Sequence, residues 1–461
     1  MMFGLPIATT ITIIPLIGIL FIALTKERNI LGIKSVSLWT TSFAFFFSLI
    51  VAGAFDFSKK IYTEELPFFN KSPIAYRVGI DEFSALFVPI ICAICCCCIL
   101  WIMKHKTNKI FYMSLLLFES LAIGAFYAWD MILMFLLIEA TSIPLYIMMS
   151  QQKDKSTDAA LHFFVYSILS AILILIAFIT IYLEAHTTNI KEIQEIGINN
   201  KGVFWLLAAG IGIKMPIFPF YNWLPIAHVK SKTVCSVLLA SIVLKFSVLL
   251  IVRFMQPLFM GVFQEYIHIV LFVILLSIAF ATFQLTLQDD LKSLFAYFSI
   301  IHMNSAFFIL LAEMKSSGFT FAMMCHSILL AILFFISHIV EKVYNSRSIR
   351  AIKIMTTAPK VIQICAFFAF YFIISAPFSG GFVTEILTFQ ALSNLSILGT
   401  FVFIAFSLIA VTFSIYVYNQ LFPFWKKCDC SSFALDPYKK IALVLLMLAS
   451  FILGIFPKVI F

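Results

Sequence analysis

Long apolar stretches separated by short polar connections recur along the whole chain. Each stretch is about 20 residues long, which is the length of a helix that crosses the hydrocarbon core of a bilayer. Barrel strands would be about half as long and would alternate in polarity. The pattern therefore predicts about fourteen transmembrane helices, over residues 5–24, 36–57, 82–103, 110–128, 131–150, 159–184, 203–225, 233–254, 266–287, 292–312, 317–341, 360–392, 396–424 and 440–460.

Composition excludes a large water-soluble domain. Hydrophobic residues make up 62% of the 461 residues and charged residues only 11%, which leaves too little polar surface for a soluble fold of this length. The main partner of the chain is therefore a lipid bilayer, and we expect no nucleic-acid partner. Phenylalanine contributes 54 residues, and the abundance of Phe, Ile, Lys and Asn, which AT-rich codons favour, hints at an organellar gene.

The charges of the connections predict the orientation of the helices. Connections that follow odd-numbered spans carry a clear excess of Lys and Arg, as in the segments 25–35, 104–109 and 341–360, whereas the even-numbered connections do not. Loops rich in Lys and Arg stay on the cytoplasmic or matrix face of a membrane. With fourteen spans, both termini should then lie on the opposite face.

Two predicted spans, the seventh and the twelfth, carry helix-breaking residues near their middle. The seventh contains Lys214-Met215-Pro216 and Pro219, and the twelfth contains Pro377 followed by Gly380-Gly381. Proline removes a backbone donor, and paired glycines loosen a helix, so both spans should be discontinuous. Matched breaks in two halves are typical of inverted-repeat transporters, although Pro and Gly are also common in ordinary membrane helices.

The breaks lie five spans apart, which divides the chain into four predicted segments. Residues 1–109 hold spans one to three, 110–254 the first five-helix repeat, 255–425 the second repeat, and 426–461 a loop with the last span. The predicted fold is thus an all-α polytopic membrane protein with two inverted five-helix repeats.

Few ionisable residues lie within the predicted spans, and each is a functional candidate because a charge at the bilayer centre costs at least ~2.5 kcal/mol. These residues are Glu119, Glu139, His162, Lys214, Lys245, His302, His326, His338 and Glu385. We predict that Glu139, Lys214, Lys245, His302, His326 and Glu385 form a proton relay.

Lys214 and Glu139 are predicted to pair across the helix bundle. Opening such a pair would favour release of the lysine proton, so the pair would act as a gate; the alternative is a static ion pair that joins two helices. Lys245 lies in the middle of its span without a carboxylate nearby in sequence, which suits a proton carrier. Arg253, two turns later, is expected to extend to the interface.

The other ionisable residues are weighed against ordinary structural roles. His302 and His326 suit a relay because histidine titrates near neutral pH, but a buried neutral histidine bonded to a carbonyl explains them about as well. His162 and His338, nearer to span ends, are expected to be structural. Glu385 follows the second break as Lys214 precedes the first. Glu119 has no evident partner and is expected to be a second access point or an interfacial residue.

The ten cysteines do not indicate a metal site. Eight of them, including the run Cys95–Cys98, lie inside apolar stretches and are expected to behave as small hydrophobic residues. Cys428 and Cys430 form a pair in a polar loop without further ligands nearby. We assign no metal and no cofactor to this chain.

Several motifs resemble the antiporter-like membrane subunits of NADH-ubiquinone oxidoreductase (respiratory complex I), most closely the chain 4 branch. The matching residues run in family order from about residue 79 to 385. They include Gly79-Ile80-Asp81, Glu139 with Pro144, Lys214-Met215-Pro216, Trp223-Leu224-Pro225, Ala227-His228-Val229, Leu244-Lys245, Asp290-Leu291-Lys292, His302-Met303, His326, and Gly381-Phe382 with Glu385. The chain departs from the family pattern at Ser231-Lys232, Asn304, Ser327 and Thr384.

The resemblance implies a proton channel of the complex I membrane arm in the mitochondrial inner membrane. It implies a coupled Glu139–Lys214 pair, a central Lys245 and an exit-side Glu385, where a glutamate rather than a lysine distinguishes chain 4 from chains 2 and 5. Those two chains are the expected neighbours, and FMN, iron–sulfur clusters and ubiquinone are expected in partner subunits. The termini would face the intermembrane space.

Two other functions remain open from the sequence. One is an autonomous cation/proton antiporter of the related Mrp type, which shares much of this motif set. The other is a structural membrane scaffold in which the buried charges only hold helices together.

Overall fold

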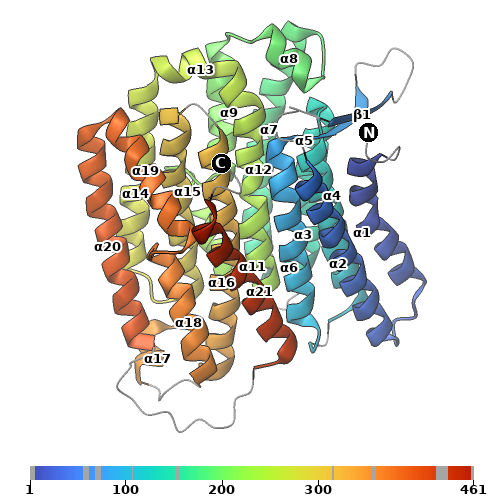
Figure 1. Ribbon diagram of the computed structural model, residues 1–461, viewed down its shortest axis with the longest axis vertical. Coiled ribbons are helices and arrows are strands. Elements are labelled where there is room, and N and C mark those ends of the chain that lie inside the picture. Colours follow the sequence, from blue (N-terminus) through green and yellow to red (C-terminus); the bar gives the residue numbers. More distant parts are fainter. Residues whose placement is uncertain are drawn as a thin grey trace. The chain divides into compact units, whose positions relative to one another are not determined.

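The computed structural model describes residues 6–55, 62–67, 74–105, 107–151, 156–313, 316–354, 360–421 and 435–457. The connection that contains Cys428 and Cys430 lies outside these residues. Twelve continuous helical stretches of the described residues are long and apolar enough to cross a membrane, and they coincide with twelve of the predicted spans (Figure 1). The other two predicted spans, 203–225 and 360–392, each hold two helices separated by a non-helical turn. The total of fourteen and the inverted repeat stay predictions, as do the four predicted segments.

The chain divides into two compact units, which are residues 1–214 with 246–262, and residues 215–245 with 263–461. The first unit contains α1 (Ile7–Leu24), α2 (Ile30–Ala54), β1 (Tyr62–Pro67), β2 (Ala75–Ile80), α3 (Glu82–Ile102), α4 (Lys109–Tyr127), α5 (Met131–Ala140), α6 (Ser142–Ser150), α7 (Ser156–Ala185), α8 (Ile190–Ile196), α9 (Lys201–Lys214) and η2 (Ile251–Met255). The second contains α10 (Trp223–Lys230), α11 (Thr233–Leu238), η1 (Leu239–Val243), α14 (Ile267–Thr286), α15 (Leu291–Glu313), α16 (Ser316–Tyr344), α17 (Ile349–Ile354), α18 (Lys360–Ile373), α19 (Gly380–Leu395), α20 (Ile397–Leu421) and α21 (Pro437–Ile455). Helices α12 (Lys245–Leu250) and α13 (Gln256–Glu265) each cross a boundary between the units.

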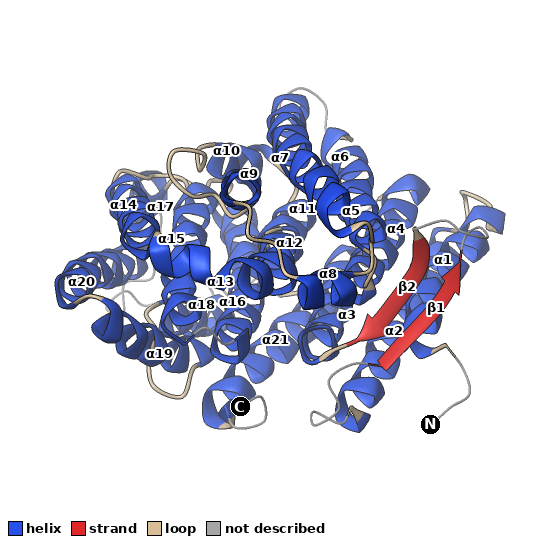
Figure 2. Ribbon diagram, turned by 90° about the horizontal axis from the view of Figure 1, so that it is seen from above, coloured by secondary structure: helices blue, strands red, loops and turns tan. Residues whose placement is uncertain are grey.

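In the first unit, α4 is the central helix and packs against α1, α3, α5 and α6. The all-α prediction missed one element, because β1 and β2 pair as an antiparallel hairpin with Tyr62 opposite Ile80. Figure 2 shows this hairpin across the ends of the N-terminal helices. The hairpin lies in a polar connection, where apolar periodicity gives no signal for a strand.

Many helices begin at a side chain that accepts bonds from the free amides of the first turn. Asp81 and Ser84 form a reciprocal capping box at α3, while Asn108 caps α4, Asp130 caps α5 and Ser379 caps α19. Such caps satisfy donors that would otherwise be unpaired at a helix end. The polar residues between apolar stretches therefore set where these helices start.

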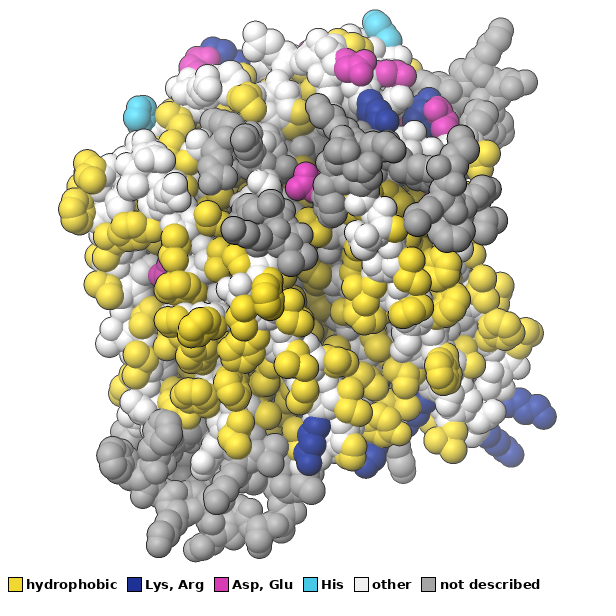
Figure 3. Space-filling model, viewed as in Figure 1, with side chains coloured by type: hydrophobic (Ala, Val, Ile, Leu, Met, Phe, Trp, Pro, Cys, Tyr) yellow, Lys and Arg dark blue, Asp and Glu magenta, His cyan; other side chains and the backbone are white. Residues whose placement is uncertain are grey.

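Lysine side chains close helix ends where the odd-numbered connections of the first unit meet. Lys109 donates to the carbonyls of Ala23 and Thr25 at 2.8 and 2.9 Å, and Lys34 donates to the carbonyl of Met103 at 2.6 Å. These bonds place the first and third connections at one end of the unit. Figure 3 shows Lys and Arg side chains at that end of the N-terminal helices and a hydrophobic band above them.

Both predicted helix breaks are confirmed. Helix α9 ends at Lys214, and α10 begins only at Trp223 after a turn with two prolines. Helix α18 ends at Ile373, and α19 begins at Gly380. The backbone of the second turn adopts positive φ at Ser375 and Phe378, which a regular helix does not allow.

A glycine of α21 allows close packing on the second break. A Cβ atom at Gly454 would lie 2.2 Å from the carbonyl oxygen of Phe378, which is backbone and cannot move away as a side chain could. Only glycine permits this approach. The last helix thus supports the turn between α18 and α19 from outside.

The span with Lys245 contains two π-helical turns that the sequence did not reveal. η1 immediately precedes the Leu244–Lys245 step, and η2 contains Arg253. A π turn carries one extra residue and weakens the regular i→i−4 bonding, so carbonyl groups become available to side chains. The carbonyl of Ala240 in η1 accepts a bond from Lys245 at 3.0 Å.

The expectation that Arg253 extends to the interface is wrong. Its side chain is 1% exposed, lies 4.5 Å from the Trp129 ring and donates to the carbonyls of Phe126, at 2.7 Å, and Ala128. An ion pair of 3.3 Å joins it to Asp81. The free carbonyls at the C-terminal end of α4 supply acceptors that a guanidinium fork can satisfy inside the protein, so Arg253 has no need to reach water.

In the second unit, α15 and α16 are almost wholly buried, whereas α14, α20 and α21 bury much less of their surface. Helix α15 packs against α10, α14, α16 and α19. Residues of α15 and α16 thus lie at the centre of this unit, and both helices carry predicted relay histidines.

Candidate functional site

The six predicted relay residues form two groups, one in each unit. In the first unit, the ammonium of Lys214 lies 2.8 Å from a carboxylate oxygen of Glu139, which confirms that they pair. Lys214 is the last residue of α9, where the free carbonyls and the helix dipole favour a cation. Its side chain is 9% exposed and that of Glu139 is 20% exposed. The pair is therefore mostly removed from water but not sealed.

Local structure around Glu139 explains its position. Pro144 lacks an amide hydrogen, so the carbonyl of Ala140, four residues earlier, loses its helical partner and the helix divides into α5 and α6. Glu139 lies directly before this division. The Ser167 hydroxyl donates to its second oxygen at 3.4 Å and also contacts Ser142 at 3.1 Å, so the carboxylate has polar support besides Lys214.

In the second unit, Lys245 contacts His326 directly, with 2.6 Å between Nζ and Nδ1. Both side chains are buried. The other ring nitrogen, Nε2, lies 3.2 Å from the hydroxyl of Ser299 on α15. If Lys245 is an ammonium, Nδ1 of His326 accepts a hydrogen bond from it, and Nε2 donates a hydrogen bond to the Ser299 hydroxyl. The imidazole can thus accept a proton on one side and release one on the other.

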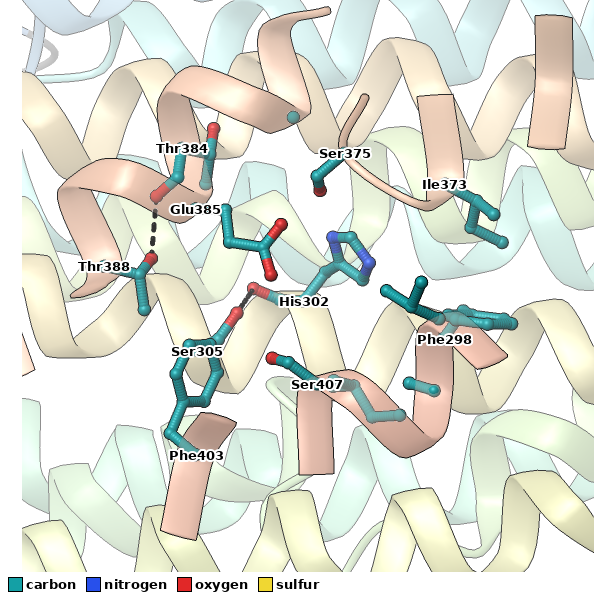
Figure 4. A pocket seen from close by; sticks show the side chains of 14 residues that line it. Phe298, His302, Ser305, Ile373, Ser375, Thr384, Glu385, Thr388, Phe403 and Ser407 are labelled. Carbon is teal, nitrogen blue, oxygen red and sulfur yellow. Dashed lines mark hydrogen bonds between the residues drawn. The ribbon is translucent and has the colours of Figure 1, made fainter. Parts of the chain in front are cut away.

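His302 continues this chain of contacts toward Glu385. The rings of His302 and His326 lie 6.5 Å apart between centroids, too far for a direct bond but short enough for a bridging water. His302 and Glu385 both line a cavity with Ser305, Ser375 and other residues of α15, α19 and α20. In Figure 4 the His302 ring and the Glu385 carboxyl point into the same space.

The cavity between His302 and Glu385 is large enough for water. The volume open to the centre of a water molecule is about 40 Å³, against roughly 10–15 Å³ that one water needs. Ser375, in the turn before α19, lines the same cavity as Glu385. A second small cavity adjoins both His302 and His326. The two cavities and the polar side chains that line them thus connect His326, His302 and Glu385.

The structure also places the ionisable residues outside the predicted relay, and the burial of one of them, Lys292, was not predicted. His338 contacts the hydroxyl of Thr233 at 3.1 Å, and His162 is exposed on α7. Neither takes part in the described contacts of the six relay residues. Lys292 was missed as a buried charge. It is buried at the start of α15 and donates to the carbonyl of Ser231 at 2.6 Å, and its place next to Asp290 in a connection concealed this burial.

Glu119 is not near a helix end, so the expectation of an interfacial residue is wrong, while a second access point stays a prediction. It lies in the middle of α4, a mostly buried helix, and its side chain is completely buried. Burial of this kind depends on the neighbouring helices and leaves no mark in the hydropathy of α4 itself. Among the described residues, no group of three or more His, Cys, Asp or Glu side chains could hold a metal ion.

Comparison with known proteins decides the family. A family model described as the transmembrane region of NADH:quinone oxidoreductase and Mrp antiporters matches residues 128–414, which is more than half of the chain. The chain belongs to this NADH:quinone oxidoreductase/Mrp antiporter family. The matched region contains all six relay residues.

Relatives of this family match almost the full chain. NADH-quinone oxidoreductase subunit M of Rickettsia felis is 28% identical over 439 residues, covering 91% of this chain and 89% of that protein. NADH-ubiquinone oxidoreductase chain 4 of Mycosarcoma maydis is 26% identical over 470 residues, covering 98% and 96%. These relatives bear out the resemblance to chain 4.

Solved structures bear out the fold. A chain of respiratory complex I from Thermus thermophilus superposes with a TM-score of 0.86 at 20% identity, covering 98% of this chain and 96% of that one. A chain of the membrane-bound sulfane sulfur reductase, an archaeal respiratory membrane complex, gives a TM-score of 0.85 at 18% identity, covering 98% and 94%. The fold of the family is thus found in respiratory complexes with different chemistry.

Proposed function

We propose that this chain is a proton-translocating membrane subunit of NADH:ubiquinone oxidoreductase. The observation that carries the proposal is the chain of buried contacts from Lys245 through His326 and His302 to the cavity at Glu385. A charge in hydrocarbon is costly, so a series of them in contact implies a function in ion movement. The complex itself is inferred from the names of the relatives that match almost the full chain.

In this proposal protons move through groups that can each bind and release one. The order is Glu139, Lys214, Lys245, His326, His302 and Glu385. Lys214 releases a proton when its pair with Glu139 opens, and Lys245 passes one to His326 across the 2.6 Å contact. Water in the cavity between His302 and Glu385 completes the route.

The redox chemistry would be carried out by partners. We propose that FMN, iron–sulfur clusters and ubiquinone bind to other subunits and that electron transfer there changes the electrostatic environment of the Glu139–Lys214 pair. Antiporter-like chains 2 and 5 are the proposed neighbours. The proposed location is the mitochondrial inner membrane, with both termini toward the intermembrane space.

Proton pumping by the assembled complex carrying Lys245→Ala tests this function. We expect normal assembly and a large loss of pumped protons per NADH oxidised, because His326 loses its proton donor. Lys26→Ala, in an exposed connection, is the matched control and should pump normally. Undiminished pumping by an assembled Lys245→Ala complex would refute the proposal.

A second candidate is a cation/proton antiporter that works without redox partners, because the matching family model covers Mrp antiporters as well. Purification separates the two. Co-isolation with quinone reductase subunits supports the first function, and Na⁺ or K⁺ exchange by the chain alone in liposomes supports the second. The scaffold alternative instead predicts that neutral replacement of Lys214 or Glu385 impairs assembly as much as pumping.

A further inference from the structure

Ser299 differs from three other buried serines of α15 and α16 in what its hydroxyl contacts. Ser305, Ser327 and Ser337 each donate to a carbonyl three or four residues earlier in their own helix, at 3.0, 2.9 and 2.7 Å, which is the usual bond of a serine inside a helix. The fully buried Ser299 hydroxyl instead lies 3.2 Å from Nε2 of His326 on the neighbouring helix. Its side chain is thus turned toward the relay.

The contacts of Lys245 determine which nitrogen of the His326 ring carries a lasting hydrogen. A carbonyl oxygen can only accept, so Lys245 donates to the carbonyl of Ala240 at 3.0 Å. The other contact of Lys245, at 2.6 Å to Nδ1 of His326, shares one hydrogen. That hydrogen resides on Lys245 when the lysine is an ammonium, and on Nδ1 when the lysine is a neutral amine and the ring an imidazolium. In both states Nε2 carries a hydrogen, which the Ser299 oxygen accepts.

Transfer of a proton from Lys245 to His326 therefore needs no rearrangement of the heavy atoms. The bond between Nζ and the hydrogen breaks, a bond between Nδ1 and the same hydrogen forms, and the summed charge of the two side chains does not change. Each charged state keeps two partners: the ammonium has the Ala240 carbonyl and Nδ1, and the imidazolium has the lysine amine and Ser299. The bond to Ser299 strengthens when the ring becomes charged, because charge-assisted hydrogen bonds are about twice as strong as neutral ones.

We propose that Ser299 is a positioning residue of the relay, a role that rests on the proposed function. Its hydroxyl holds the His326 ring with Nδ1 against Lys245 and stabilises the imidazolium that forms when Lys245 gives up its proton. Without this hydroxyl, Nε2 would carry a buried hydrogen that has no acceptor, which is unfavourable for both states of the ring and more so for the charged one. The proton would then remain on Lys245.

Proton pumping by the assembled complex carrying Ser299→Ala tests this role. Loss of the charge-assisted bond should make the transfer roughly tenfold less favourable, so we expect several-fold fewer protons pumped per NADH oxidised. Ser299→Thr keeps a hydroxyl and should recover most of the pumping. Ser337→Ala, which removes a buried hydroxyl whose bond stays within α16, is the matched control and should pump normally. Normal pumping by Ser299→Ala, or a Ser299→Thr complex that is equally impaired, overturns the proposal.

A combination with His326→Gln separates positioning from a general effect on packing. If Ser299 acts through the His326 ring, Ser299→Ala should leave the residual pumping of a His326→Gln complex unchanged, because the two side chains belong to one interaction. A further loss as large as the loss in the wild-type background contradicts the proposal.

Infrared spectroscopy of the same complexes separates this proposal from the proposed function. The ring C–N stretch of His326 is identified as the band that His326→Gln removes, and its frequency depends on the hydrogen bond at Nε2. Ser299→Ala should shift this band and Ser299→Thr should not, whether or not Lys245→Ala abolishes pumping. A band that stays in place in Ser299→Ala refutes the bond on which the proposal depends. Ser299→Cys, which is similar in size and carries a weakly accepting thiol, replaces Ser299→Ala if that variant does not assemble.

Discussion

Replacing Lys214 by methionine removes one partner of the most clearly formed ion pair among the relay residues. The two charged atoms lie 2.8 Å apart, and removal of one member of a buried pair costs roughly 3–5 kcal/mol. The 20% exposure of Glu139 lets water stabilise the orphaned carboxylate, so we expect the lower end, about 3 kcal/mol. Glu139→Gln should cost a similar amount because it leaves a buried ammonium.

The double variant distinguishes an ion pair from two independent side chains. With both charges removed, neither residue is left as a buried unpaired ion, and we expect a cost of only about 1 kcal/mol. The measurement is the thermal midpoint at which the purified complex loses this subunit. The midpoint should fall in the order wild type, double variant, single variants. Single-variant losses that simply add in the double variant would refute the reasoning.

Three further predictions follow from other contacts. Arg253→Ala leaves two carbonyls and a carboxylate without their donor, so it should lower stability by roughly 3–5 kcal/mol, measured as the same thermal midpoint; Arg253→Lys should recover only part of this. Gly454→Ala should displace the turn at Phe378 and lower both the midpoint and pumping, and an unchanged midpoint would contradict the close approach. His326→Ala should assemble but pump several-fold less than wild type, whereas His162→Ala, at an exposed position of α7, should pump normally.

The helix breaks could be predicted because their causes are local, and the pairing of Lys214 with Glu139 could be predicted because each is a charge of opposite sign within an apolar stretch. Proline and paired glycine act on the turn in which they stand, and a charge in an apolar stretch must find a partner wherever it folds. The same reasoning predicted Lys245 as a buried lysine. It could not predict that His326 is its partner, because 81 residues separate them and several polar groups were equally available.

The sequence alone determined the membrane character of the chain, twelve of the spans, the two discontinuous helices and the burial of Lys214 and Lys245, since each depends on residues close together in the chain. Tertiary structure decided which face of each helix is enclosed. That choice buried Glu119 in the middle of α4, turned Arg253 inward onto Asp81, and aligned Lys245 with His326. Membrane helices that are apolar on all sides carry little periodic signal, so only the packing of neighbouring helices fixes where their few polar side chains point.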